Sequence, residues 1–213
     1  YIADYLFANP ASLVTKTVAI NYLKQQYNNS ITALNNAWNT NFTSFDDLTR
    51  PIRNISSFTG RAREDIVDLS IMMIDEYIRV PSEAAKKVAP NHLNLGVRWG
   101  GLRNNDTLLA GTKYMDVFSL NYYTSYPDLA LIGRITRLLN VPVMITEFHS
   151  GSLDSGLWSN GLRGSPTQEE RGKYYSYYVE NLAALPGVVG AHYFQLFDQP
   201  ALGHSGGECT QIG

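Results

Sequence analysis

The segment Val143-Met-Ile-Thr-Glu-Phe-His149 places one carboxylate, that of Glu147, at the end of an apolar run typical of a buried β-strand. Burying an ionised carboxylate costs free energy unless the group is paired or takes part in chemistry. Glu147 is therefore a candidate for covalent or acid–base catalysis. A second interpretation stays open, in which Glu147 is a structural acid paired with Arg98 or with a tyrosine hydroxyl.

The next predicted strand end adds polar and aromatic side chains. His192, Tyr193 and Gln195 close the last apolar run, and Asp198 follows them. A carboxylate among aromatic rings and hydrogen-bonding groups suits a carbohydrate, because sugar C–H faces stack on rings while hydroxyl groups need polar partners. The tyrosines between residues 174 and 178 have a simpler explanation, since they lie on one predicted helix and indicate a tyrosine-rich core.

Four short apolar segments are predicted as strands because helical patterns separate them. The strands are Leu93–Trp99, Asp116–Tyr122, Val143–Phe148 and Val188–Phe194, and the helices are Thr107–Lys113, Asp128–Leu139 and Gln168–Leu185. This alternation is typical of βα units around a parallel sheet. Each strand ends in polar or aromatic residues, and in an eight-stranded βα barrel catalytic groups converge at the carboxyl ends of strands.

The part before residue 90 has helical periodicity instead. Apolar residues repeat at helical spacing in Ser12–Tyr27, in Ile31–Trp38 behind the N-cap Ser30, and in Thr59–Arg79, which Pro81 is expected to break or kink. The predicted fold class is therefore α/β. We expect one domain over residues 1–213, with a helical segment of about 11–90 and βα units of about 91–213.

A complete barrel of this type takes about 250 residues and eight strands, so four strands predict the C-terminal half of a barrel. Two open sheet edges would invite aggregation. We therefore expect either self-association or a missing N-terminal half-barrel to cover them.

Composition and charge exclude several classes of function. The formal net charge is -2 and basic residues are interspersed with acidic ones, which argues against nucleic acid as a partner. No apolar run approaches the roughly 20 residues of a membrane span, and no signal peptide opens the chain. Cys209 is the single cysteine, so an intrachain disulfide is excluded. The histidines match no compact metal motif, and we expect neither a metal nor a cofactor.

Several separated motifs, in the same order, resemble the second half of the exo-acting β-agarases of glycoside hydrolase family fifty. They read Asn91-His-Leu-Asn-Leu-Gly-Val-Arg98, Ile145-Thr-Glu-Phe-His149 with Leu153-Asp-Ser-Gly156 and Gly161-Leu-Arg163, and Ala191-His-Tyr-Phe-Gln195 with Asp198-Gln-Pro200. Upstream, Tyr27 to Trp38 resembles the helical stretch after strand four. The resemblance implies strands five to eight of a (β/α)8 TIM-type barrel, preceded by helices that follow strand four.

The resemblance also implies roles for individual residues. Glu147 would be the nucleophile of a retaining glycosidase, while the general acid belongs to an Asn-Glu pair that this chain lacks, so it is expected outside the chain. Asn121 and Tyr122 are expected to orient Glu147 or to hold a sugar hydroxyl. Further candidate sugar contacts are Arg98, Trp99, His149, Trp158, His192, Tyr193, Gln195 and Glu208. Arg98 could also fix the neighbouring carboxylate.

Two departures from the family pattern put the exact sugar in doubt. Gly206-Gly-Glu208-Cys209 stands where the family reads Asp-Gly-Glu-Asn, and Asn121-Tyr122 stands where agarases have Asn-Arg. The expected function is hydrolysis of a galactose-containing poly- or oligosaccharide through a covalent glycosyl-enzyme on Glu147. The alternative is a catalytically incomplete half-barrel that binds saccharide or self-assembles. The family implies a secreted or periplasmic location.

Overall fold

The computed structural model describes residues 1–10, 13–101, 110–154 and 156–202. These residues form two compact units, the first containing residues 1–80 with 110–111 and the second containing residues 81–101 with the described part of 112–202. The division lies close to the predicted boundary between the helical and βα parts. A single domain over the whole chain stays a prediction. Within the described ranges, no helix is long and apolar enough to cross a membrane.

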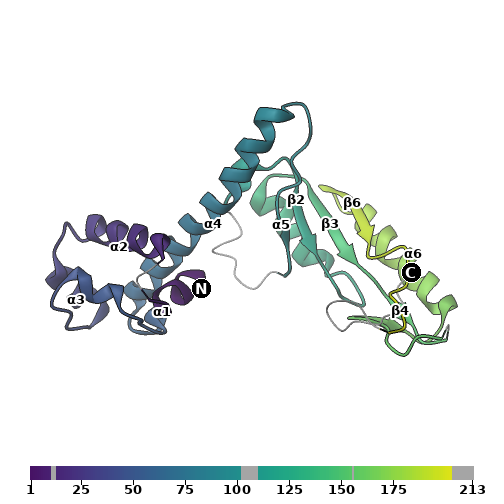
Figure 1. The fold of residues 1–213 in the computed structure, drawn as a ribbon. Coiled ribbons are helices and arrows are strands. Elements are labelled where there is room, and N and C mark those ends of the chain that lie inside the picture. Colours follow the sequence, from purple (N-terminus) through teal and green to yellow (C-terminus); the bar gives the residue numbers. More distant parts are fainter. Residues whose placement is uncertain (11–12, 102–109, 155, 203–213) are drawn as a thin grey trace. The chain divides into compact units, whose positions relative to one another are not determined.

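The first unit is built from helices (Figure 1). It contains α1 (Ile2–Ala8), α2 (Val14–Gln26), α3 (Ile31–Trp38), the 3-10 helices η1 (Phe45–Thr49) and η2 (Ile55–Ser57), and the beginning of α4 (Gly60–Val88). The predicted helices at α2, α3 and α4 are confirmed, as is the cap of α3, where the Ser30 hydroxyl accepts the Ala33 N–H at 3.1 Å. The seven-residue α1 was not predicted, because it is too short to show a periodic pattern.

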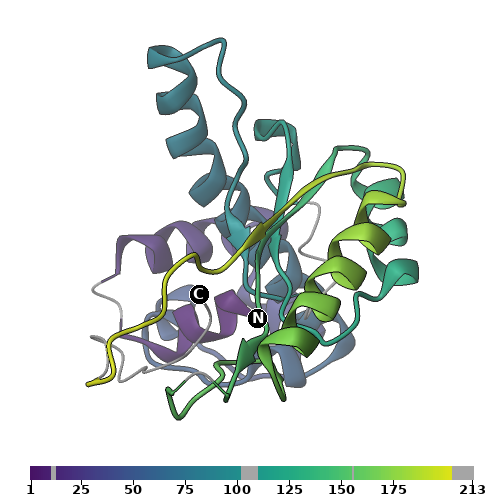
Figure 2. The ribbon, with the colours of Figure 1, turned by 90° about the vertical axis from the view of Figure 1, so that its right-hand side faces the viewer.

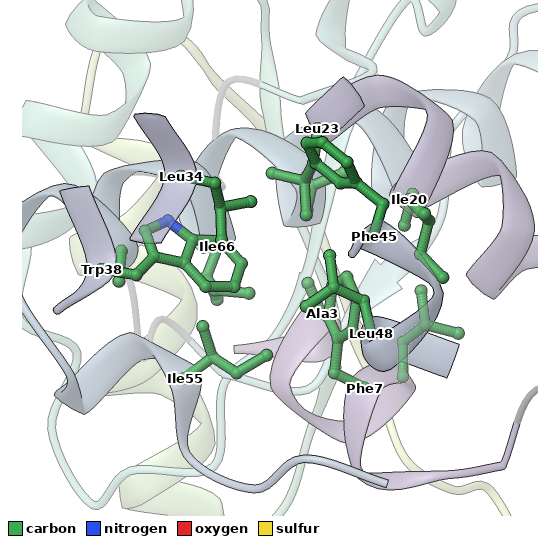
Figure 3. Close-up of a cluster of buried hydrophobic side chains, with 14 residues drawn as sticks. Ala3, Phe7, Ile20, Leu23, Leu34, Trp38, Phe45, Leu48, Ile55 and Ile66 are labelled. Carbon is green, nitrogen blue, oxygen red and sulfur yellow. The ribbon is translucent and has the colours of Figure 1, made fainter. Parts of the chain in front are cut away.

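The helices of this unit share one apolar core, in which side chains from α1, α2, α3, η1, η2 and α4 point toward one another (Figure 3). The core includes Ala3, Phe7, Ile20, Leu23, Leu34, Trp38, Phe45, Leu48, Ile55 and Ile66. At one edge of the core, the Asp65 carboxylate accepts the Trp38 Nε1–H at 2.7 Å and forms an ion pair with Arg61 at 2.8 Å. Apolar burial of this extent is what makes these short helices stable.

Lys16 in the first turn of α2 is fully buried and holds the end of α1 in place. Its ammonium donates to the carbonyl oxygens of Phe7 at 3.0 Å, Asn9 at 2.5 Å and Arg50 at 2.8 Å. Burial lowers the pKa of Lys16 because desolvation disfavours the charged form. The three carbonyls use all three ammonium protons, and two of them cap the C-terminal ends of α1 and η1.

Helix α4 continues through Pro81 to Val88, so the predicted break there is wrong, and a kink at Pro81 stays a prediction. A proline removes one intrahelical hydrogen bond, but packing is present on both sides of it, because Ile78 and Ser82 are buried. Gly111 supports this packing on the Ile78 side. It has a φ of +71°, and an added Cβ would lie 2.5 Å from Cδ1 of Ile78. Only glycine fits both the backbone angle and the space.

The second unit contains a parallel sheet of four strands in the order β1-β2-β3-β6, which confirms the predicted α/β class. The strands are β1 (Arg98–Trp99), β2 (Phe118–Asn121), β3 (Val143–Phe148) and β6 (Val188–Tyr193), and two-residue strands β4 (Gly151–Ser152) and β5 (Gly164–Ser165) pair separately. Helices α5 (Leu129–Leu139) and α6 (Gln168–Ala183) connect successive parallel strands. Both helices cover the same face of the sheet (Figures 1 and 2).

Two predicted elements differ from the structure. The expected strand Leu93–Trp99 is reduced to β1, because side chains bind the backbone that the ladder would use. The Asp116 carboxylate accepts the Asn94 N–H at 2.6 Å and an Nζ–H of Lys86 at 2.9 Å. The Asn94 N–H, and then Lys86, hold the pKa of Asp116 below its usual value. Of the helix expected at Thr107–Lys113, residues 107–109 lie outside the described residues, and the described part is a turn followed by the 3-10 helix η4 (Thr112–Tyr114).

Candidate active site

The carboxyl ends of the parallel strands bring together side chains that lie far apart in the sequence. β1 ends at Trp99, β2 at Asn121, β3 at Phe148 and β6 at Tyr193. Because all four strands run in the same direction, these ends lie along one edge of the sheet. This is the edge at which parallel α/β folds bind their ligands.

Glu147 lies at this edge with both carboxylate oxygens engaged. Arg98 forms an ion pair with Oε1, and the Tyr123 hydroxyl donates to Oε2 at 2.7 Å. The Glu147 side chain is 14% exposed, whereas that of Arg98 is 60% exposed. The predicted contact between Arg98 and a neighbouring carboxylate is confirmed. Pairing with arginine and tyrosine fits both a catalytic and a structural carboxylate, so these contacts alone do not assign the role.

Tyr123 is the residue that the sequence prediction missed, since it had named Tyr122. The Tyr122 side chain lies on the other side of the strand end, near the backbone of Asp128, the N-cap of α5. Burial raises the pKa of Tyr122, and the Asp128 backbone opposes this rise. Because successive side chains of an extended chain alternate, Tyr123 then faces Glu147. Alternation alone did not select Tyr123 over Tyr122, because the side that faces Glu147 depends on the register of β2 against β3.

Asn121 lies beside Glu147 in the sheet, at an irregularity in the pairing of β2 and β3. Its side-chain oxygen accepts the Thr146 hydroxyl at 3.0 Å. Asn121 therefore contacts the residue before Glu147. The expected role of Asn121 in orienting the carboxylate or binding a sugar hydroxyl stays a prediction.

His149 follows β3 and is buried, with a 4% exposed fraction. Its Nδ1 lies 3.1 Å from the carbonyl oxygen of Phe194, and its Nε2 accepts the N–H of Leu162 at 2.9 Å. The N–H of Arg163 approaches the same Nε2 at 3.4 Å. The ring of Tyr123 meets the imidazole edge to face, with 4.8 Å between centroids.

Known proteins resemble this chain along nearly its whole length, although no family model matches it. It is 32% identical over 202 residues to β-agarase B of Vibrio sp. (strain JT0107), an alignment that covers 93% of this chain and 21% of that protein. The solved structure of the agarase AgWH50C matches with a TM-score of 0.89 and 36% identity, covering 100% of this chain and 30% of the other. A solved exo-β-agarase matches with a TM-score of 0.88 and 31% identity, covering 97% and 28% of the two chains.

The chain belongs to the agarase-like GH50 family. This confirms the resemblance inferred from the separated motifs, and by that resemblance the family is one of glycoside hydrolases. The chain spans about a fifth of the length of β-agarase B.

In this GH50 chain, the Trp99 side chain points away from that of Arg98. Its ring stacks on the buried Phe118, with centroids 6.2 Å apart and planes at 17°. Adjacent residues of a strand point to opposite faces, so Trp99 packs with the core while Arg98 reaches Glu147. The structure therefore does not place the Trp99 ring beside the carboxylate.

The residues predicted at the end of β6 have different surroundings. The Tyr193 hydroxyl donates to the carbonyl of Ser150 at 2.9 Å, and its ring packs edge to face on Phe148 at 5.4 Å. Burial raises the pKa of Tyr193. This tyrosine therefore joins β6 to the end of β3. Gln195 is half-buried and His192 is exposed, and their predicted sugar contacts stay predictions.

Two predicted sugar contacts remain, Trp158 and Glu208, and both stay predictions. Trp158 is 76% exposed in the segment between β4 and β5. Glu208 lies outside the described residues. Among the residues that the structure does describe, no group of three or more His, Cys, Asp or Glu side chains could hold a metal ion.

Proposed function

We propose that this chain carries the nucleophile of a retaining β-glycosidase that cleaves galactoside bonds in agar. The observation that carries the proposal is Glu147, a largely buried carboxylate at the carboxyl end of a central parallel strand, with one oxygen held by Arg98 and the other by Tyr123. Relatives named β-agarase, similar over 93% and 89% of the chain, supply the substrate class.

In this mechanism a Glu147 oxygen attacks the anomeric carbon. The bond to the glycosidic oxygen breaks as the bond to Glu147 forms, and a general acid gives its proton to the leaving oxygen. Water then attacks the same carbon, gives a proton to the residue that had acted as acid, and releases Glu147 as a carboxylate. Arg98 and Tyr123 hold the carboxylate in one orientation. This lowers the entropic part of the activation free energy for the attack on the anomeric carbon.

The proposal leaves the general acid to a part of the protein outside these 213 residues. Retaining glycosidases place the two carboxyl groups about 5 to 5.5 Å apart. The four strands would then be strands five to eight of a (β/α)8 barrel. Its other half would cover the free edges of β1 and β6, which a parallel barrel does not leave open.

The proposal is tested in the full-length protein that contains this sequence. Glu147→Gln should lower the rate of agarose hydrolysis at least about 1000-fold, because the covalent step is lost. Glu169→Gln is the matched control, since Glu169 is 79% exposed and forms a surface ion pair with Lys173. It should leave the rate unchanged.

A second readout separates a nucleophile from a carboxylate that only supports the site. With Glu147→Ala, an activated aryl β-galactoside and added azide, azide can occupy the space of the carboxylate and attack from the same face. The product should be the α-galactosyl azide, with inverted configuration at the anomeric carbon. Hydrolysis of agarose by Glu147→Gln at the wild-type rate would refute the proposal and favour a saccharide-binding module.

A further inference from the structure

The hydrogen bonds of His149 define its protonation state. A backbone carbonyl can only accept, so Nδ1 facing the carbonyl of Phe194 must carry a hydrogen. A backbone N–H can only donate, so Nε2 facing the N–H of Leu162 must present its lone pair. His149 is thus a neutral imidazole protonated on Nδ1. A second proton on Nε2 would oppose the N–H groups of Leu162 and Arg163.

These bonds connect three separate segments around the buried ring. His149 itself follows β3, Phe194 follows β6, and Leu162 precedes β5. The Gly151 N–H also donates to the carbonyl of Arg163 at 2.9 Å, which fixes the same segment next to the end of β3. The imidazole is therefore held by the backbone on two sides.

Besides these backbone contacts, the imidazole contacts Tyr123, a residue of the candidate active site. The Tyr123 ring lies at 65° to the imidazole plane with 4.8 Å between centroids, and the Tyr123 hydroxyl reaches Oε2 of Glu147. The other partner of the carboxylate, Arg98, has a mainly exposed side chain. Tyr123 is the more enclosed of the two partners, so the direction of its ring matters most for the carboxylate.

We propose that His149 is a positioning residue for Glu147, acting as a neutral imidazole that fixes the ring of Tyr123. This inference rests on the proposed role of Glu147 as nucleophile. It replaces the sequence expectation that His149 contacts the sugar, because backbone groups already occupy both ring nitrogens. A residue that acts through Tyr123 should change the chemical step and leave substrate binding unaffected.

A double-mutant cycle in the full-length protein tests this path. Tyr123→Phe should lower kcat on an agarose oligosaccharide about 10- to 100-fold, the loss typical of one hydrogen bond to a charged group. His149→Ala should lower kcat about 10-fold with KM changed less than about twofold. In the Tyr123→Phe background, His149→Ala should cost less than about twofold more, because its route to Glu147 is already broken.

Two further variants keep the test decisive. His149→Gln retains an acceptor for the Leu162 N–H and repeats the cycle if the alanine variant fails to fold. His92→Ala changes an exposed histidine and should leave kcat unchanged. A higher KM for the His149 variants with normal kcat, or losses that multiply in the double variant, would overturn the inference. If Glu147→Gln stays active in the same assay, the proposed function itself fails.

Discussion

Replacing Lys16 by methionine tests whether a buried ammonium stabilises the helical unit. The change keeps an unbranched apolar side chain and removes the donor to three carbonyls. The carbonyl of Phe7 is fully buried, and an orphaned buried acceptor costs about 1–3 kcal/mol. The carbonyls of Asn9 and Arg50 are part-buried and can bind water, so each adds less than about 1 kcal/mol.

An opposing contribution comes from desolvation, because the methionine variant no longer buries a charge. Two of the carbonyls end helices, whose negative dipole ends favour a cation. We therefore expect Lys16→Met to lower the local free energy of unfolding by about 2–3 kcal/mol. Hydrogen exchange of peptides from α1 and α2 in the full-length protein measures this effect.

A loss of this size should accelerate exchange about 30- to 150-fold. The matched control is Lys24→Met in the same helix, whose ammonium forms no hydrogen bond or ion pair with the residues that the structure describes. It should change the local free energy by less than about 0.5 kcal/mol. Equal or slower exchange in Lys16→Met would refute the reasoning and show that desolvation outweighs the three hydrogen bonds.

Three other predictions follow from local contacts. Gly111→Ala should lower the melting temperature, because the positive φ and the contact with α4 together cost about 2 kcal/mol. Gly172→Ala is the control, because there is open space around Gly172 in α6, and it should raise the free energy of unfolding by about 0.5–1 kcal/mol. The lowered pKa of Asp116 means that its carboxylate stabilises the fold above the usual pKa of 3.8 and loses this effect as pH falls through the lowered value. The difference in melting temperature between wild type and Asp116→Asn should therefore be constant near neutral pH and shrink in acid; a constant difference at every pH would contradict this. Arg98→Met should leave the melting temperature nearly unchanged, because the arginine is mainly exposed, yet lower the hydrolysis rate about 10- to 100-fold by freeing one oxygen of Glu147.

The periodicity of apolar residues was sufficient to predict the larger elements. The strand at Val143–Phe148 has its predicted bounds, and the helices at Leu129–Leu139 and Gln168–Ala183 differ by a residue or two. The strand predicted at Leu93–Trp99 was too long, because a side chain there competes with the backbone ladder: the Asp116 carboxylate binds the Asn94 N–H. Strands β4 and β5 have two residues each, too few for any periodic signal.

The site could be predicted as far as Glu147 and Arg98, whose charges stand out at strand ends. The choice between Tyr122 and Tyr123 depends on the register of β2 against β3, which shifts at Asn121. Register is set by pairing between segments more than 20 residues apart, so local pattern could not give it. The protonation state of His149 could not be predicted either, because its hydrogen-bond partners are backbone atoms, which carry no signal in the sequence.

That dependence on backbone partners has a consequence for the segment before β5. Leu162 and Arg163 serve His149 through their N–H groups, which every amino acid except proline provides. Side chains at these two positions can therefore be varied freely in a library while the imidazole stays in place. Proline is the one replacement that such a selection should remove, most strongly at position 162, whose N–H makes the shorter bond.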